Sequence, residues 1–138
     1  MSYTIKVNLT QSGHPFTVRD QAVRHNGGTW EGEGLYDMSL TLNMKNSGFA
    51  GALLCRRAKD DDSCCILVGV VGYKPFCDVV TDLSPDDTAV GIIETVYGRS
   101  NWVRKAKETK TTSKGTVVEV GFLNVDGNSL NAEIKITS

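Results

Sequence analysis

VGVVGYKPFCDVVTDL, residues 68–83, is the stretch that decides the fold. It opens with β-branched residues bounded by glycines, which is typical of a strand. After Pro75, a residue type favoured at the first position of a helix, Asp78 and Thr81 stand three positions apart. We therefore expect a short helix that carries both side chains on one face. A strand that runs directly into a helix gathers polar side chains and free helix N–H groups at one rim, which suits a hydroxyl-rich or charged ligand.

Strand patterns dominate the rest of the chain. Alternating or continuous apolar residues predict further strands at 3–10, 16–24, 29–30, 38–42, 49–57, 64–71, 116–122 and 130–136. Residues 64–71 are nearly all apolar, as expected of a central strand that is buried on both faces. Ser84 and Pro85, followed by two acidic residues, predict the start of a second helix, which Gly98 should end. The sum is a single domain over residues 1–138, mainly β: an antiparallel β-sandwich with an inserted helix–loop–helix.

Composition places the chain among soluble globular proteins. Its 138 residues are 40% hydrophobic and 22% charged, and 15 Lys+Arg against 16 Asp+Glu give a net charge of −1. With so small a net charge, the chain has no overall electrostatic attraction to nucleic acid or to anionic lipid. The N-terminus, MSYTIKVNLT, alternates like a strand and lacks the apolar core of a signal peptide, so we expect a cytoplasmic protein. No apolar run is long enough to span a membrane.

Metal and cofactor sites are not expected. The four cysteines lack a CxxC spacing and only two histidines are present, so buried thiols are favoured over a zinc site. Three consecutive acids, Asp60 to Asp62, could suggest calcium, but the glycine and the distal glutamate of an EF-hand loop are missing. A solvated turn is the interpretation that we favour there.

Three other function classes have weaker support. An enzyme is not expected, because neither histidine accompanies a nucleophile signature and no phosphate or dinucleotide motif occurs. The acids Asp86 and Asp87 are explained more simply by the helix dipole. Residues 99–114 are basic, with Trp102 as a possible stacking ring, but lysines on edge strands also prevent edge pairing. A pore-forming toxin would need a mobile amphipathic helix, and the N-terminus is a strand pattern.

The order of motifs resembles the fungal fruit-body lectin family, the group of Agaricus bisporus lectin and the bolete lectins. The resemblance rests on SYTIKV at the start, NGGTW at residues 26–30, the loop 46–48, VGVVGYKPFCDVVTDL, PDDTA at residues 85–89, and GNSLNAEIKITS at the end. It covers nearly the whole chain. It implies an actinoporin-like β-sandwich, usually a homotetramer, with two sugar sites on either side of the helical insert.

One implied site takes Galβ1-3GalNAc, the T-antigen disaccharide. Carried over by position, it would use Ser47 and Gly48, with His25 standing where the family has a small residue. Family members carry His-Asn before a Tyr-Lys pair, whereas this chain has Val71 and Gly72 before Tyr73. The lost asparagine side chain predicts a weakened galactosyl site.

The other implied site takes terminal N-acetylglucosamine. Asp78 and Thr81 match the family, and Val79 would contribute its backbone. The family arginine corresponds to Arg99 or Arg104, and the family tyrosine falls near Thr111, where no tyrosine exists. A carboxylate, a guanidinium and a hydroxyl are the groups that pair best with sugar hydroxyls.

The sequence therefore predicts a non-catalytic, cytoplasmic carbohydrate-binding protein that prefers N-acetylglucosamine-type termini. No cofactor is expected; glycans are the expected partners, together with further copies of the chain in a dimer or tetramer. The family suggests a role in defence. The alternatives are a family fold that has lost sugar binding and serves as a structural or storage protein, and a weak nucleic-acid binder acting through residues 99–114.

Overall fold

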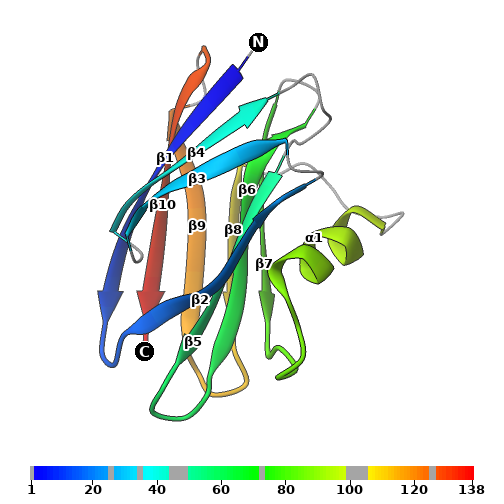
Figure 1. The fold of residues 1–138 in the computed structure, drawn as a ribbon. Coiled ribbons are helices and arrows are strands. Elements are labelled where there is room, and N and C mark those ends of the chain that lie inside the picture. The colour runs from blue at the N-terminus through cyan, green and yellow to red at the C-terminus, as the bar shows by residue number, and fades with distance from the viewer. Residues whose placement is uncertain are drawn as a thin grey trace.

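Two β-sheets face one another and form a sandwich (Figure 1). The computed structural model describes residues 2–24, 27–33, 36–43, 50–71, 74–98, 106–124 and 127–138. Sheet A has the spatial order β3 (Gly28–Glu33), β4 (Tyr36–Asn43), β1 (Ser2–Ser12), β10 (Ser129–Thr137), β9 (Val117–Asn124) and β8 (Lys107–Thr111). Sheet B has the order β2 (Phe16–Val23), β5 (Ala50–Arg57), β6 (Ser63–Val71) and β7 (Lys74–Thr81). The predicted β-sandwich is confirmed.

One strand pair departs from the expected antiparallel arrangement. β1 and β10 run parallel in the middle of sheet A, in a register that pairs Ile5 with Leu130 and Leu9 with Ile134. All the other strand pairs of the described residues are antiparallel. Alternation of apolar residues fixes which face a strand buries but not its direction, so the sequence could not reveal this pairing.

Burial follows the strand patterns closely. The inward residues of both sheets form one core, in which Ile5, Leu40, Val79 and Ile134 are fully buried. β6 is buried on both faces, as predicted from its continuous apolar run, because a second cluster lies on the outer side of sheet B. There the helix α1 (Ala89–Gly98) packs Ile93 and its apolar neighbours against β5 and β6 (Figure 1).

The prediction of a short helix after Pro75, the first helix of the expected helix–loop–helix, is wrong. Residues 74–81 form the strand β7, in antiparallel register with β6 from Val71↔Lys74 to Cys64↔Thr81. Within this strand Cys77 and Val79 face the sandwich core, while Phe76 and Val80 face α1. Both faces are thus covered, and the β-branched run Val79, Val80 and Thr81 suits a strand. In the described residues α1 is the only helix.

α1 also begins later than the sequence suggested. Ser84 and Asp87 form the expected capping contacts, with the Ser84 amide donating to Asp87 Oδ2 at 2.7 Å, but these contacts close a turn. The helix starts at Ala89, because Thr88 Oγ1 accepts the Gly91 amide at 3.0 Å and thus acts as the N-cap. The Ala89 amide is held from outside the helix by Asp20 Oδ2 of β2 at 2.9 Å. The helix is described as far as Gly98, and its predicted end there stays a prediction because residues 99–105 lie outside the described part of the chain.

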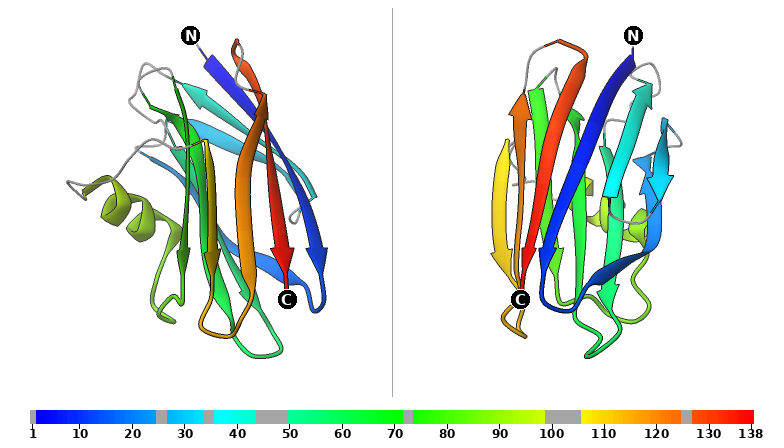
Figure 2. Two further views of the ribbon diagram at one scale, coloured as in Figure 1. Left: turned by 180° about the vertical axis from the view of Figure 1, so that it is seen from behind. Right: turned by 90° about the vertical axis from the view of Figure 1, so that its left-hand side faces the viewer.

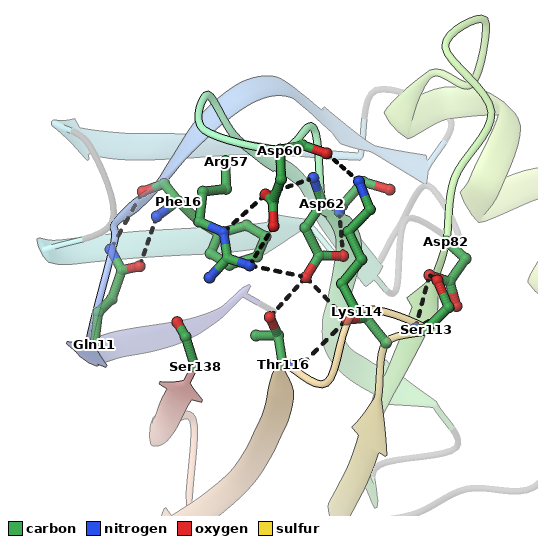
Figure 3. A network of polar contacts seen from close by, with 12 residues as sticks. Gln11, Phe16, Arg57, Asp60, Asp62, Asp82, Ser113, Lys114, Thr116 and Ser138 are labelled. Carbon is green, nitrogen blue, oxygen red and sulfur yellow. Dashed lines mark hydrogen bonds and ion pairs between the residues drawn. The ribbon is translucent and has the colours of Figure 1, made fainter.

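The acidic turn after β5 is not simply solvated. Asp60 receives two hydrogen bonds from Arg57, at 3.0 and 2.8 Å, whereas Asp62 is 2% exposed. Asp62 Oδ2 accepts hydrogen bonds from the hydroxyls of Thr112 at 2.9 Å and Thr116 at 2.6 Å (Figure 3). The turn between β5 and β6 is therefore fastened to the turn between β8 and β9. The carboxylates of Asp60 and Asp62 are occupied by protein donors, and the described residues contain no cluster that could hold a metal ion.

All four cysteines are free and buried, as predicted. Burial raises the pKa of the Cys65 thiol, and a hydrogen bond with Cys64 raises that of Cys55. Such thiols are poor nucleophiles. No helix in the part of the chain described here is long and apolar enough to cross a membrane.

Candidate functional site

Asp78 and Thr81 lie on β7, an edge strand of sheet B. Successive side chains of a strand leave opposite faces, so residues three positions apart point away from each other. Asp78 lies on the side of Phe76 and Val80, and Thr81 on the side of Cys77 and Val79. The prediction that both side chains share one face is wrong. What the two residues share is their position on one edge strand, not a common face of it.

The outer edge of β7 presents backbone groups that β6 does not use. The Asp82 amide donates to the Ser63 carbonyl at 3.3 Å, which marks this pair as hydrogen-bonded. In an antiparallel ladder such pairs alternate with pairs that are not hydrogen-bonded. In the register Cys64↔Thr81, Ile66↔Val79, the N–H and C=O groups of Val79 and Thr81 therefore point away from β6, toward the outer edge.

The Asp78 carboxylate bends toward this same edge. Its Oδ1 accepts the Val79 amide at 2.8 Å, which satisfies one of the outward N–H groups. The side chain of Asp78 is 15% exposed. No described residue donates a hydrogen bond to its Oδ2, and this largely buried carboxylate lies on the same strand as the outward Val79 carbonyl and Thr81 amide. This arrangement offers an acceptor, a second acceptor and a donor within one short segment.

Lys110 completes the site from the opposite sheet. It lies on β8, the edge strand of sheet A, and its Nζ is 3.4 Å from Asp78 Oδ1. Its side chain is 38% exposed, so the ammonium group can donate to a ligand while it orients the carboxylate. On the same strand Glu108 Oε1 accepts the Thr109 amide at 3.0 Å, the arrangement that Asp78 makes with Val79. Sequence reasoning treated Lys110 only as part of a basic segment, because its partner lies 32 positions away.

Thr81 precedes Asp82, whose hydrogen bonds form a second connection between the ends of β7 and β8. The backbone of Asp82 is in the left-handed region, with φ 56°. Its carboxylate accepts hydrogen bonds from the Ser113 amide at 3.0 Å and from the Ser113 hydroxyl at 2.8 Å. The backbone bond from Ser113 comes first among the causes that lower the pKa of Asp82, and the Thr81 hydroxyl adds to it. These hydrogen bonds hold the end of β7 beside the turn that follows β8. They fix how far β7 and β8 are shifted along each other.

The remaining predicted site residues lie outside the described part of the chain. These are Arg99 and Arg104 of the N-acetylglucosamine-type site, and His25, Ser47, Gly48, Gly72 and Tyr73 of the galactosyl site. Their assignments stay predictions.

Comparison with known proteins places the chain in a family. Residues 1–134 match the family described as fungal fruit body lectin. The chain is 35% identical to a lectin of Boletus edulis over 97% of its own length and 98% of that protein's length. The crystal structure of the wild-type lectin of Xerocomus chrysenteron superposes with a TM-score of 0.87 at 34% identity, covering 99% of both chains. A structure of a mutated form of that lectin gives a TM-score of 0.86 at 33% identity, over 99% of this chain and 98% of the other. The predicted resemblance is confirmed, and this chain belongs to the fungal fruit body lectin family.

Proposed function

We propose that the chain binds glycans that end in N-acetylglucosamine, without catalysis, at the edge of β7. Membership of a lectin family supports a carbohydrate-binding role in general. The observation that carries the specific proposal is the Asp78 carboxylate. One oxygen accepts the Val79 amide and lies 3.4 Å from Lys110 Nζ, at a strand edge where the C=O of Val79 and the N–H of Thr81 point away from β6.

This set of groups fits a pyranose that carries an acetamido substituent. A carboxylate oxygen accepts hydrogen bonds from two neighbouring hydroxyls, and the Lys110 ammonium donates to a ring or hydroxyl oxygen. The outward Thr81 N–H and Val79 C=O complement the C=O and N–H of the acetamido group. An arginine from residues 99–105, predicted as Arg99 or Arg104, would add a second donor.

Two lysines of the basic segment, residues 99–114, give no support to the nucleic-acid alternative. Lys110 pairs with Asp78, and Lys114 donates to the Asp60 carbonyl (Figure 3). Both thus have partners within the fold. Binding of Galβ1-3GalNAc, a cytoplasmic location and a defence role stay predictions based on the resemblance alone.

The test is calorimetric titration of the whole protein with N-acetylglucosamine and its β-linked oligomers, preceded by a glycan array. Asp78→Asn keeps the shape of the side chain and removes its charge. Because hydrogen bonds to charged groups contribute about 1.5–3 kcal/mol, we expect at least about a tenfold weaker affinity with an unchanged melting temperature. Asp86→Asn, in the exposed turn before α1, is the matched control and should bind like the wild type.

Two outcomes would contradict the proposal. If the wild type binds no glycan on the array and no N-acetylglucosamine at millimolar concentration, the alternative of a family fold without sugar binding takes the place of this proposal. If sugar binding is found but Asp78→Asn leaves it intact, the site lies elsewhere in the fold.

A further inference from the structure

Cys55 and Cys64 face each other across two neighbouring strands of sheet B. They occupy directly opposite positions in the antiparallel register of β5 and β6. Both side chains point into the core between the two sheets, and both are fully buried. The two thiols are within hydrogen-bonding reach, because a hydrogen bond with Cys64 comes first among the causes that raise the pKa of Cys55. The fold therefore holds two sulfur atoms together that lie nine positions apart in the sequence.

The backbone at this pair has the spacing that a disulfide bond requires. The Arg57 amide donates to the Asp62 carbonyl at 2.9 Å, so these two residues form a hydrogen-bonded pair. Cys55 and Cys64 lie two positions further along each strand and form the next pair of the same kind. The α-carbons of such a pair are about 5.5 Å apart, and disulfide bonds connect α-carbons about 4.4–6.8 Å apart. A bond between these cysteines thus leaves the strand register unchanged.

Neither of the other two cysteines stands opposite a cysteine. Cys65 lies opposite Leu54 and Val80, on the face of sheet B that α1 covers. A bond between the adjacent Cys64 and Cys65 would have to join opposite faces of one strand. Cys77 lies opposite Val68, and its thiol donates to the Val120 carbonyl at 3.9 Å. The register therefore selects one disulfide, between Cys55 and Cys64.

Burial protects this pair as long as the sandwich is closed. A thiol reacts with a disulfide as its thiolate, which burial disfavours, and a buried sulfur is also out of reach of a second molecule. The pair nevertheless lies near an end of the sandwich, two positions from the residues Arg57 and Asp62 that flank the turn between β5 and β6. Ends of strands open locally at a lower free energy than the whole domain unfolds. Opening of this turn would expose both thiols at once.

The buried carboxylate of Asp62 keeps the turn closed. It accepts hydrogen bonds from the hydroxyls of Thr112 and Thr116, which belong to the turn between β8 and β9. Figure 2 shows these two turns next to each other at the lower end of the sandwich in both of its views. An opening that exposes the thiols has to break these two hydrogen bonds. The connection between the sheets therefore controls access to the cysteines.

We propose that Cys55 and Cys64 are a redox-active pair, which a low-molecular-weight disulfide such as oxidised glutathione converts into a cross-strand disulfide when the turn after β5 opens. One cysteine loses its proton and attacks the oxidant, which forms a mixed disulfide and releases one glutathione thiolate. The second cysteine then loses its proton and attacks the protein sulfur of the mixed disulfide, which releases the second glutathione thiolate. Two electrons pass from the protein to the oxidant, which leaves as two reduced glutathione molecules. The proposal does not depend on sugar binding.

The bond should stabilise the folded chain. It closes a loop over residues 55–64 and so restricts the unfolded chain, while the strands keep their register. We therefore expect the oxidised protein to melt about 5 °C or more above the reduced protein. A reductant should reverse this difference only as fast as the turn opens, because the bond is buried once it has formed.

The test is a mass-spectrometric count of thiols in the full chain. The reduced protein is incubated with millimolar oxidised glutathione, quenched in acid and alkylated in denaturant. We expect a product that has lost two of its four thiols and retains no glutathione. Trypsin cleaves after Arg56, Arg57 and Lys59, so peptides that stay joined across these sites reveal the bond. Cys65→Ala should leave the same two peptides joined, which assigns the bond to Cys64.

Three variants test whether the turn controls the reaction. Asp62→Asn weakens the hydrogen bonds that close the turn and should speed disulfide formation at least about tenfold. Asp61→Asn, which removes an exposed charge of the same turn, should leave the rate unchanged. Gly51→Ala lies at the other end of β5 and should lower the melting temperature with a much smaller effect on the rate. This third variant separates local opening from general destabilisation.

Three results would overturn the proposal. The folded wild type could keep all four thiols, or end as a mixed disulfide with glutathione. The joined peptides could carry Cys65 or Cys77 in place of Cys55 or Cys64. Finally, Asp62→Asn could react no faster than Gly51→Ala, which would mean that the cysteines react only after the whole domain unfolds.

Discussion

The Thr116 hydroxyl donates a 2.6 Å hydrogen bond to Asp62 Oδ2, across 54 positions of the chain. This bond connects the turn after β5 in sheet B with the turn after β8 in sheet A. Arg57, 6% exposed, lies 3.5 Å from the same carboxylate oxygen and also pairs with Asp60 (Figure 3). A buried charge is thus neutralised where the two sheets come together, at the end of the sandwich.

Asp62→Asn should destabilise the protein by about 2–4 kcal/mol, because Arg57 and two threonine hydroxyls lose a charged acceptor in a buried place. Urea unfolding followed by circular dichroism measures the change. Asp61→Asn is the matched control, since that side chain is 70% exposed and should change stability by less than about 0.5 kcal/mol. Equal effects of the two substitutions would show that the network contributes little.

Stability should fall in acid through Asp60. Its hydrogen bonds from Arg57 lower the pKa of this carboxyl to about 2, below the unfolded value of about 3.9. A lowered folded-state pKa contributes stability above the unfolded value, and this contribution is lost as the pH falls from about 3.9 toward 2. Asp60→Asn should therefore flatten the loss of unfolding free energy in this window. An unchanged slope between pH 5 and pH 2 would contradict the assignment.

Gly51→Ala should cost about 1–3 kcal/mol, because a Cβ atom there would lie 2.9 Å from Trp30 Cε2 and Leu40 Cδ2. These side chains belong to sheet A, so a methyl group at position 51 would press against the facing sheet. Gly121→Ala is the comparison, with a nearest contact of 3.4 Å to a flexible lysine, and should be close to neutral. The melting temperatures of both variants decide the point.

Lys110→Met should weaken N-acetylglucosamine binding, if the proposed site is correct, and should do so through Asp78. A double-mutant cycle with Asp78→Asn measures the coupling, which for residues in direct contact is about 0.5–3 kcal/mol. Calorimetric affinities that are simply additive would mean that the two residues act separately. Lys74→Met, at the exposed start of β7, controls for the loss of a positive charge.

Most strands of the fold could be predicted because alternation and continuous apolar runs report burial directly. The prediction failed at β7, where the spacing of Asp78 and Thr81 suggested a helix. Pairing with β6 and cover from α1 decide its conformation, and neither is visible in the local sequence. Ser84 similarly forms the capping contacts that its sequence indicates, yet α1 begins only after Thr88. Thr88 caps the helix, and Asp20 of β2 accepts the hydrogen bond of its first amide.

The candidate site was only partly predictable, for the same reason. Asp78 was identified, but Lys110 comes from the other sheet, and the partners of Asp62 lie 50 and 54 positions away. A side chain's partner across two sheets follows from topology, and alternation carries no information about topology.

The parallel pairing of β1 with β10 has a consequence for biosynthesis. β10 lies between β1 and β9, so the first and the last of the described strands in chain order are neighbours in the sheet. Until residues 129–137 have emerged, β3–β4–β1 and β9–β8 are two separate pieces with unpaired inner edges. Such edges promote aggregation, and contacts between distant segments form slowly. Sheet A therefore closes only after β10 has been synthesised, and loss of that strand would separate the sheet into two parts rather than shorten it.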